Sequence, residues 1–363
     1  MSVQTLFNRR NTRKVRVGGL TIGGGAPIVI QSMTNTDTHD VDATYDQVMR
    51  LEEAGCQMVR ITAPDIASAN TFAALKSRGV SLPLVADIHF DHRIAIACVN
   101  SGVDKIRINP GNVGGDENVA EVVEACKRGS VPIRIGVNSG SVEKSILQKH
   151  GGPTAEALAE SALYHASLLE RLDFYDTVIS VKASTVPNMI KANAVLAERT
   201  DYPLHLGVTE AGGGESALVK SSIGIGALLS MGIGDTVRVS LTDDPAQEIE
   251  AAKLMLGALG LDSSPYMDVV SCPTCGRTRI DLIGIVREFK ERARLEGIHT
   301  LPIKVALMGC VVNGPGEASE ADIGIAGGKG EGLLFKKGKI VRKLKEESLV
   351  DELISEIKQT YLN

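Results

Sequence analysis

The sequence has very few aromatic residues. Its 363 residues include six Tyr, six Phe and no Trp. A surface that binds nucleic acid by base stacking needs exposed aromatic rings, and a net charge of -5 provides no general attraction for a polyanion. We therefore expect no nucleic-acid partner, and any anion site must be local. The core must be aliphatic, which suits a parallel sheet covered by helices.

Long hydrophobic runs are also missing. No stretch of about 18 apolar residues occurs, so no membrane span is predicted. Residues 1–16 are basic and polar with no apolar run behind them, which is unlike a secretory signal. We therefore expect a cytoplasmic protein in a reducing compartment. Its six cysteines are then expected to be core residues, metal ligands or catalytic thiols rather than disulfides.

Short β-branched runs alternate with helical patterns over most of the chain. The predicted strands cover residues 27–34, 58–62, 83–88, 105–110, 132–138, 177–182, 203–209 and 236–240. Helical patterns between and after them include residues 41–54, 65–77, 117–128, 155–171, 188–199, 215–230 and 245–259. Eight such units are typical of a closed (β/α)8 TIM-type barrel. An open, doubly wound sheet is the alternative, but no strand is followed by a G-x-G-x-x-G pattern.

Two further segments frame the predicted barrel. Residues 11–26 carry four aliphatic residues among glycines, and they predict a small hairpin at the bottom of the barrel. The turn-rich sequence GLDSSP at 260–265 indicates a domain boundary. We therefore expect a barrel over residues 1–260 and a smaller α+β domain over residues 261–363. In the latter, the pattern predicts helices near 280–295 and 346–361 and a hairpin at 332–342.

Positive charges recur at the ends of the predicted strands. In (β/α)8 barrels the functional groups lie at the carboxyl ends of the strands. Five of the eight strands carry a cation there, namely Arg60, Arg107, Arg134, Lys182 and Arg238. A single arginine could form an outward salt bridge to a helix. Five cations at one barrel mouth instead predict a binding site for a compact, multiply charged anion such as phosphate or diphosphate.

Acidic and titratable residues stand at two further strand ends. Asp87 and His89 close the third predicted strand, and Glu210 follows the seventh. Beside a bound anion these side chains are candidates for proton transfer. Each of them could instead be a structural hydrogen-bonding group.

The cysteines fall into two groups. Those in or near the predicted barrel helices have apolar or small neighbours and are expected to be buried core residues, namely Cys56, Cys98 and Cys126. The other three stand among turn-forming residues. Cys272 and Cys275 lie in SCPTCGR, and Cys310 lies in MGCVVNGPGE.

Three interpretations of the second group are open. The three thiolates could hold an iron–sulfur cluster whose remaining iron takes a carboxylate, such as Glu317, that a substrate oxygen can displace. They could form a zinc site, for which His299 is the available fourth ligand. The C-x2-C pair could also be a redox dithiol, although no thioredoxin-like βαβ context surrounds it.

The motifs together identify a family resemblance. SCPTCGRT and MGCVVNGPGEA, with the strand motifs QSMT, RIT, ADIHF, KIRINPGN, PIRIGVN and GVTEAG, closely resemble the 4-hydroxy-3-methylbut-2-en-1-yl diphosphate synthases. These are enzymes of the methylerythritol phosphate route to isoprenoids. The resemblance covers nearly the whole chain. The large insertion of the plant form is absent, so the chain resembles the short, two-domain bacterial type.

The resemblance implies an activity and a cofactor. The family reduces 2-C-methyl-D-erythritol 2,4-cyclodiphosphate by two electrons to 4-hydroxy-3-methylbut-2-enyl diphosphate, with ring opening and loss of water. By motif match, a [4Fe–4S] cluster would be held by Cys272, Cys275, Cys310 and Glu317. Flavodoxin or ferredoxin would supply the electrons. The family forms a homodimer in which the cluster domain of one subunit closes over the barrel of the other.

The resemblance also implies residue roles. The substrate diphosphate would be bound by Arg60, Arg107, Asn109, Arg134, Asn138, Lys182, Arg238 and Ser240. From the residues themselves, we expect Glu210 to supply the proton that lets the hydroxyl leave as water, and Asp87 and His89 to orient the substrate or relay protons. Two alternatives are a Schiff-base aldolase-type lyase that uses Lys182, and a non-enzymatic iron–sulfur carrier or sensor whose barrel binds a phosphorylated effector.

Overall fold

The structure is a computed structural model that describes residues 8–261, 267–310 and 318–362. It divides into two compact units, Met1–Asp262 and Ser263–Asn363. Each unit has its own hydrophobic core and is described by itself. Within the described ranges, none of the helices has both the length and the apolar character that crossing a membrane requires.

The first unit is a closed parallel barrel. Its strands are β3 (Val29–Met33), β4 (Met58–Thr62), β5 (Leu84–Asp87), β6 (Lys105–Ile108), β7 (Ile133–Val137), β8 (Thr177–Val181), β9 (His205–Leu206) and β10 (Thr236–Val237). Each strand pairs with the next from β3 to β8, and β10 pairs with both β9 and β3. A parallel bridge between Ile179 and Leu204 joins β8 to the start of β9, so the ring closes. The predicted (β/α)8 fold is confirmed.

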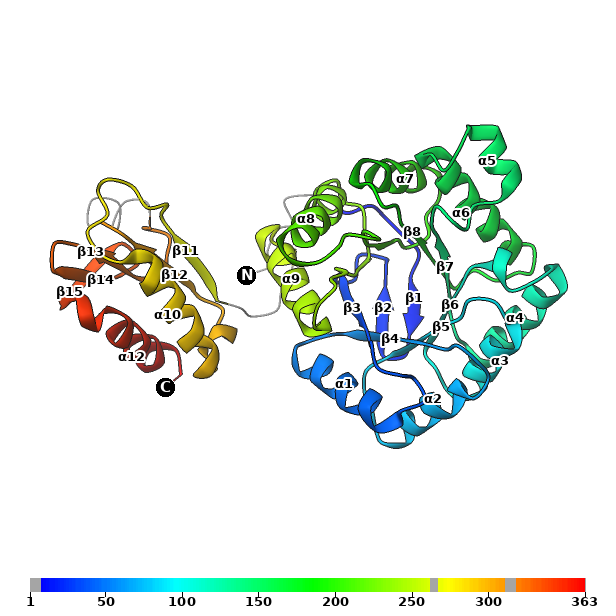
Figure 1. Ribbon diagram of the computed structural model, residues 1–363, viewed down its shortest axis with the longest axis horizontal. Coiled ribbons are helices and arrows are strands. Elements are labelled where there is room, and N and C mark those ends of the chain that lie inside the picture. Colours follow the sequence, from blue (N-terminus) through cyan, green and yellow to red (C-terminus); the bar gives the residue numbers. More distant parts are fainter. Residues whose placement is uncertain (1–7, 262–266, 311–317, 363) are drawn as a thin grey trace. The chain divides into compact units, whose positions relative to one another are not determined.

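The helices surround the strands in chain order, as Figure 1 shows. They are α1 (Val41–Glu53), α2 (Ser68–Ser77), α3 (His92–Asn100), α4 (Asp116–Gly129), α5 (Lys144–His150), α6 (Ala155–Glu170), α7 (Val186–Arg199), α8 (Gly214–Ser230) and α9 (Pro245–Ala258). Several begin at a side-chain cap; for example, Asp40 accepts a hydrogen bond from the backbone N–H of Ala43. Helices α3 and α5, the shortest of these, were not predicted from the sequence.

The aliphatic core lies between the strands and this ring of helices. Outward-facing strand residues pack against the apolar faces of the helices in one continuous cluster. This cluster includes Cys56, Cys98 and Cys126, so the prediction that they are buried core residues is confirmed. Burial raises the pKa of Cys56 to about 11 and the pKa values of Cys98 and Cys126 to about 12. These thiols are therefore protonated at neutral pH and unreactive.

A hairpin closes the amino-terminal end of the barrel. Strands β1 (Val15–Val17) and β2 (Leu20–Ile22) pair antiparallel, and Figure 1 shows them across the middle of the ring. Their buried side chains form a cluster with inward residues near the start of four barrel strands, namely Val29, Met58, Val85 and Val178. The predicted hairpin at the bottom of the barrel is confirmed. Among the described residues, the hairpin therefore fills this end of the interior, and the opposite end is formed by the carboxyl ends of the strands.

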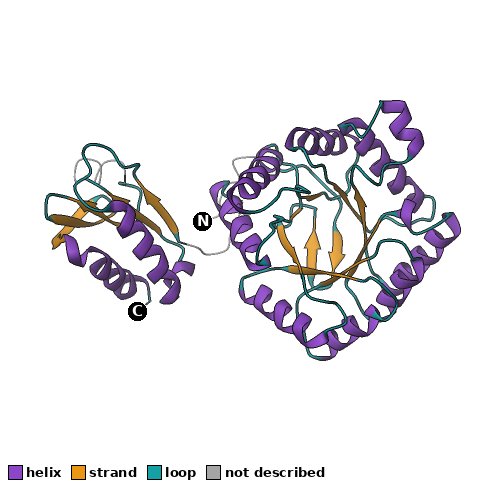
Figure 2. Cartoon of the chain, in the orientation of Figure 1, coloured by secondary structure: helices purple, strands orange, loops and turns teal. Residues whose placement is uncertain are grey.

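The second unit is a five-stranded mixed sheet with helices. Its strands, in sheet order, are β11 (Asp268–Ser271), β12 (Lys304–Met308), β13 (Ile323–Gly327), β14 (Glu331–Lys336) and β15 (Lys339–Lys345). Strands β11, β12 and β13 are parallel, and β14 pairs antiparallel with both β13 and β15. Helices α10 (Leu282–Leu295) and α12 (Leu349–Tyr361) contact each other and share the main cluster with the sheet (Figure 2). The two predicted helices and the hairpin are present, whereas β11, β12 and β13 were not predicted.

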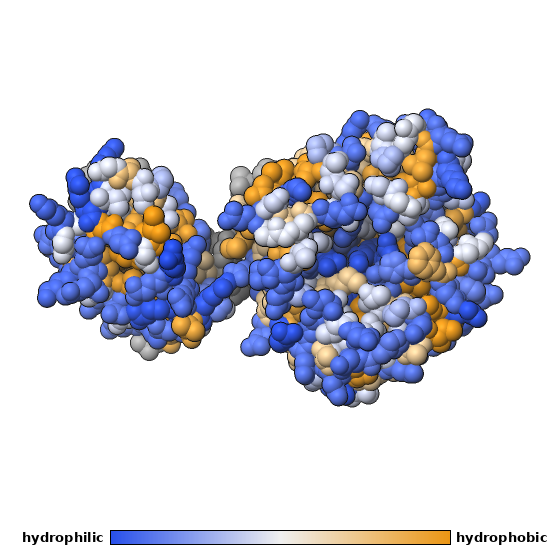
Figure 3. Space-filling view, viewed as in Figure 1, coloured by the Kyte–Doolittle hydropathy of each residue, from blue (hydrophilic) through white to orange (hydrophobic). Residues whose placement is uncertain are grey.

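Most apolar side chains lie inside these two cores. The face drawn in Figure 3 is largely hydrophilic, and apolar residues appear on it in separate patches between charged ones. The main core consists mostly of Val, Ile, Leu and Ala side chains, as the low aromatic content predicted.

The hairpin plug can be tested by truncating one of its buried side chains. Ile22 is fully buried, so Ile22→Ala should lower the free energy of unfolding of the barrel by about 2–5 kcal/mol, because it leaves a cavity in the plug. Thr21→Ala, at the exposed neighbouring position, should change the stability by less than about 0.5 kcal/mol. Equilibrium denaturation followed by circular dichroism measures both. Equal stability of the two variants would show that the plug does not support the barrel.

Candidate active site

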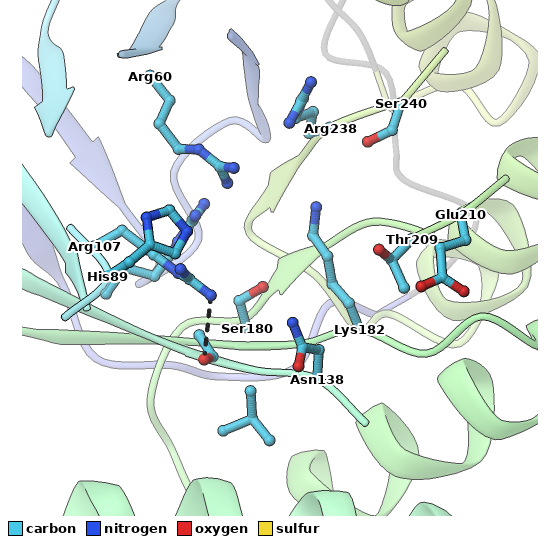
Figure 4. A pocket seen from close by; sticks show the side chains of 13 residues that line it. Arg60, His89, Arg107, Asn138, Ser180, Lys182, Thr209, Glu210, Arg238 and Ser240 are labelled. Carbon is cyan, nitrogen blue, oxygen red and sulfur yellow. Dashed lines mark hydrogen bonds between the residues drawn. The ribbon is translucent and has the colours of Figure 1, made fainter. Parts of the chain in front are cut away.

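A cavity of about 310 Å³ lies at the carboxyl ends of the barrel strands. We call it the barrel cavity; it is lined by Arg60, His89, Arg107, Arg134, Gly136, Val137, Asn138, Ser180, Lys182, Thr209, Glu210, Arg238 and Ser240 (Figure 4). All five strand-end cations are among these residues. The lining contains one aliphatic side chain, Val137, so the cavity is suited to a polar ligand.

The strand period brings these groups together. Side chains alternate between the two faces of a strand, so every second residue of a barrel strand points inward. Two inward positions are glycine, and each leaves space for a cation. A Cβ at Gly136 would lie 2.3 Å from Nε of Arg107, and one at Gly207 would lie 3.1 Å from Nζ of Lys182. The long side chains of Arg107 and Lys182 therefore fit because the neighbouring residues, Gly136 and Gly207, have no side chain.

Asp87 lies between two of the arginines. Its carboxylate is 3.3 Å from Nη2 of Arg60 and 3.3 Å from Nη1 of Arg107, and only 1% of its side chain is exposed. Burial alone would raise the pKa of Asp87, but the charges of Arg60 and Arg107 outweigh it and hold this pKa below the usual value. Asp87 is therefore ionised at neutral pH. It does not line the barrel cavity, and its geometry is that of a counter-ion that orients two arginines.

Glu248 is a counter-ion for Arg238, as Asp87 is for Arg60 and Arg107. This residue of α9 is 3% exposed, and its carboxylate accepts hydrogen bonds from Nε and Nη2 of Arg238 at 3.2 Å each. It also accepts from the hydroxyl of Ser32 and from the backbone N–H of Leu241. Sequence reasoning missed Glu248. The available signal was a carboxylate on the apolar stripe of α9, between Pro245 and Ile249.

The remaining cations have no carboxylate partner within the described residues. The guanidinium of Arg134 is 1% exposed and donates only to the side-chain oxygen of Gln31, at 3.4 Å. Burial, followed by the charges of neighbouring arginines, lowers the pKa values of Arg134 and Lys182 well below their usual values. Burial also lowers the pKa of Arg60 to about 10, although Asp87 opposes this shift. The barrel cavity therefore carries an excess of positive charge.

A sixth cation lies deeper in the barrel. Lys105 is fully buried, and its amine is 3.0 Å from the sulfur of Met58, a residue of the plug cluster. The sequence analysis did not select Lys105, although it stands two residues before Arg107 and therefore on the same face of β6. Ser180 and Thr209, which line the barrel cavity, were also missed because small hydroxyl side chains carry no distinctive pattern.

The other predicted residues occupy the rim or the loops. Glu210 and Asn138 line the barrel cavity, as do His89 and Ser240. Glu210 is exposed and has φ of 55°, a left-handed backbone conformation that is unusual for a residue other than glycine and recurs at functional sites. Asn109 does not line the barrel cavity. It is 2% exposed, and its side-chain oxygen accepts from the backbone N–H of Gly111, so it caps the turn after β6.

The cysteines of the second unit stand at the ends of two adjacent strands. Cys272 directly follows β11, and Cys310 follows β12 by two residues; because β11 and β12 are parallel, these ends meet at the same edge of the sheet. The backbone N–H of Gly309 donates to the sulfur of Cys272 at 3.2 Å. Cys275 is exposed in the turn after β11. Its backbone N–H donates to the hydroxyl of Thr278.

The donor set is suited to a metal or cluster, but the described residues contain only part of it. Thiolates prefer zinc or iron–sulfur clusters, and a backbone N–H to a sulfur is a contact that stabilises a ligating thiolate. Glu317 lies outside the described residues. Within those residues, no group of three or more His, Cys, Asp or Glu side chains is arranged to hold a metal ion.

Comparisons with known proteins cover both units. A family model of the GcpE TIM-barrel domain matches residues 12–253, and one of the GcpE protein C-terminal domain matches residues 268–359. A relative from Caldanaerobacter subterraneus subsp. tengcongensis is 56% identical over 97% of this chain and 98% of its own length. A Bacillus subtilis relative is 55% identical over 98% of this chain and 93% of its own length. Both are named "4-hydroxy-3-methylbut-2-en-1-yl diphosphate synthase (flavodoxin)".

The role of Asp87 as a buried counter-ion can be tested by neutralising it. Asp87→Asn leaves two arginines without their carboxylate and should lower the free energy of unfolding by about 3–5 kcal/mol at neutral pH. Because the folded-state pKa of Asp87 is depressed, its contribution is present above the unfolded carboxyl pKa of about 4 and is lost as the pH falls further. The difference between wild type and variant should therefore shrink on acidification.

Denaturant titrations of wild type and Asp87→Asn at several pH values measure this difference. The exposed Asp42, which pairs with Arg78 on the surface, provides the matched control; Asp42→Asn should change the stability little at any pH. A difference for Asp87→Asn that stays constant into the acid range would contradict the assignment.

Proposed function

The chain belongs to the GcpE family of 4-hydroxy-3-methylbut-2-en-1-yl diphosphate synthases, and we propose that it is an iron–sulfur oxidoreductase. Its reaction is the two-electron reductive ring opening and dehydration of 2-C-methyl-D-erythritol 2,4-cyclodiphosphate to 4-hydroxy-3-methylbut-2-enyl diphosphate. The observation that carries the proposal is the set of five cations that line one barrel cavity. A diphosphate is the ligand that best neutralises such a group.

The diphosphate is held by the guanidinium groups and the amine. Arg60, Arg107 and Arg238 are already oriented by Asp87 and Glu248, so they can bind phosphate oxygens with little rearrangement. The amide of Asn138 and the hydroxyl of Ser240 add hydrogen bonds at the rim. Opening the ring expels a phosphate oxygen on which negative charge grows. The fixed cations of the barrel cavity stabilise this charge.

Glu210 is our candidate for the proton that lets the hydroxyl leave as water. It lines the barrel cavity beside Thr209, and its strained backbone holds the carboxyl group at the rim. His89 also lines the cavity, and its Nε2 is 3.7 Å from Asp87. We propose that His89 orients the substrate and that Asp87 acts indirectly, by orienting Arg60 and Arg107. Asn109 would act indirectly, by capping the turn that follows Arg107.

Three thiolates and one carboxylate would hold a [4Fe–4S] cluster in the second unit. The proposed ligands are Cys272, Cys275, Cys310 and Glu317. The position of two cysteines at adjacent parallel strand ends, with the Gly309 N–H on the Cys272 sulfur, supports this set over a pair of isolated thiols. When bound, the cluster would pass the two electrons of the reduction one at a time from the external donor to the substrate.

The electron donor and cellular setting follow from the same family. The names of the relatives support flavodoxin as donor, and ferredoxin is the alternative. The cysteines of the described residues are all free, which supports a reducing compartment and so the cytoplasm. The homodimer stays a proposal that depends on the family resemblance alone. The Schiff-base alternative has one observation in its favour, the lowered pKa of Lys182, but it provides no role for the cysteine motifs.

The role of Glu210 can be separated from cluster binding. Glu210→Gln removes the proton donor but keeps the size of the side chain, so turnover of the cyclic diphosphate should fall by about 10²–10⁴-fold. The visible absorption of the anaerobically purified protein should not change. Glu215→Gln, in the exposed first turn of α8, is the control and should keep full turnover. Full activity of Glu210→Gln would remove Glu210 from the proton-transfer role.

The cofactor can be tested by metal analysis of cysteine variants. The anaerobically purified wild type should be brown and contain iron and acid-labile sulfide. Cys275→Ser should lose both, because a hydroxyl is a poor ligand for this cluster. Cys98→Ala, which changes a buried core thiol, should retain iron and sulfide. One zinc per chain, with neither iron nor sulfide, would overturn the iron–sulfur assignment.

A further inference from the structure

The amine of Lys182 has an unusual environment for a buried lysine. Lysine ammonium groups inside proteins are normally paired with a carboxylate. Within the described residues, Lys182 Nζ has no hydrogen-bond or ion-pair partner, and it occupies the space left by the missing side chain of Gly207. In Figure 4 its side chain extends into the barrel cavity toward Arg238.

The charged groups around Lys182 are predominantly positive. The charges that act on it most strongly are those of Arg238, Arg60, Arg134 and Arg107, one each from β10 and its continuation, β4, β7 and β6. The two buried carboxylates, Asp87 and Glu248, are already bound to arginines. The other titratable groups nearby are Glu210 and His89 at the rim and the buried His205 of β9.

In the ligand-free protein, this repulsion between cations is relieved most easily when a lysine loses its proton. An arginine guanidinium is more basic than a lysine ammonium, so a lysine loses its proton first when several cations are enclosed together. Lys182 and Lys105 are the two lysines in question. Lys182 lines the barrel cavity, whereas Lys105 lies deeper beside Met58. A ligand in the cavity therefore acts first on Lys182.

We propose that anion binding in the barrel cavity takes up a proton from solvent and that the amine of Lys182 receives it. This inference rests on the proposed function to the extent that the barrel cavity is the anion site. In the free protein Lys182 is then a neutral amine, because its Nζ lies among guanidinium groups and has no carboxylate partner within the described residues. Burial and these charges lower its pKa. An incoming anion offsets the surrounding guanidinium charges and supplies the partner that an ammonium lacks. Lys182 then binds the anion as a cation.

The coupling has a consequence for ligand affinity. When binding takes up one proton, the dissociation constant rises by about tenfold for each unit of pH between the pKa of the group in the free protein and its higher pKa in the complex. A permanently charged side chain at position 182 removes this dependence. Lys182→Arg should therefore bind the anion with an affinity that changes little between about pH 7 and pH 9.

Proton uptake can be measured directly with a ligand that does not titrate. We would use trimetaphosphate, a cyclic trianion with no titrating proton near neutral pH, and inorganic sulfate as a second probe. Calorimetric titration of the anaerobic holoenzyme in buffers of different ionisation enthalpy reports the number of protons taken up. The wild type should take up about one proton per anion near pH 8, and Lys182→Arg should take up none.

Two further variants identify the group. Lys191→Arg changes an exposed lysine of α7 that pairs with Glu156, and it should keep the wild-type uptake. His89→Gln removes the histidine of the cavity lining and should also keep it. Persistence of uptake in Lys182→Arg, or its loss in His89→Gln, would overturn the assignment to Lys182.

Failure of this inference differs from failure of the proposed function. If the wild type binds either probe without proton uptake, the inference is wrong while the anion site stands. If neither probe binds to the wild type, the inference and the anion-binding part of the proposed function both fall. Binding with uptake of about one proton, lost in Lys182→Arg alone, supports the inference.

Discussion

Enclosed positive charge is the constraint on which the rest of the barrel depends. Five cations line one cavity of about 310 Å³, and a sixth, Lys105, lies below them. Within the described part of the chain, the buried carboxylates paired with these arginines are Asp87 and Glu248. Such an arrangement costs folding free energy unless a ligand completes it. The protein tolerates this cost because a large aliphatic shell surrounds the site and a hairpin closes its far end.

The barrel separates stability from function by strand face. Outward residues are aliphatic and pack against the helices, while inward residues become polar toward the carboxyl ends of the strands. Gly136 and Gly207 leave the space that the long side chains of Arg107 and Lys182 occupy. Two further features fix charged groups at this cavity. The left-handed backbone of Glu210 places its carboxylate at the rim, and the buried carboxylate of Glu248 holds the guanidinium of Arg238.

The second unit places reactive sulfur by a different rule. Two parallel strands end side by side, and a cysteine stands one residue after the end of β11 and two residues after the end of β12. The Gly309 N–H on the Cys272 sulfur shows how the backbone of one loop supports a thiol of the other. Cysteines 272 and 310, distant in the sequence, therefore reach the same sheet edge, whereas the three barrel cysteines remain in an apolar shell that keeps them protonated.

Much of this architecture could be predicted from the sequence. The β-branched runs, their spacing and their polar ends predicted the closed barrel, its hairpin plug and the five cations, because strand period and strand order determine which residues face inward. The SCPTCGR and MGCVVNGPGE motifs predicted the family. The strands β11, β12 and β13 were missed because their short runs lie among turn-forming residues.

Other features depended on contacts between distant segments. Glu248 reaches Arg238 from a helix, Asp87 lies beneath the arginines rather than at the cavity, and Asn109 caps a turn. Lys182 lines the barrel cavity, whereas Lys105 lies deeper beside Met58. Periodicity reports the face on which a residue lies, but pairing and depth depend on how eight strands close around one axis, and only the tertiary structure decides them.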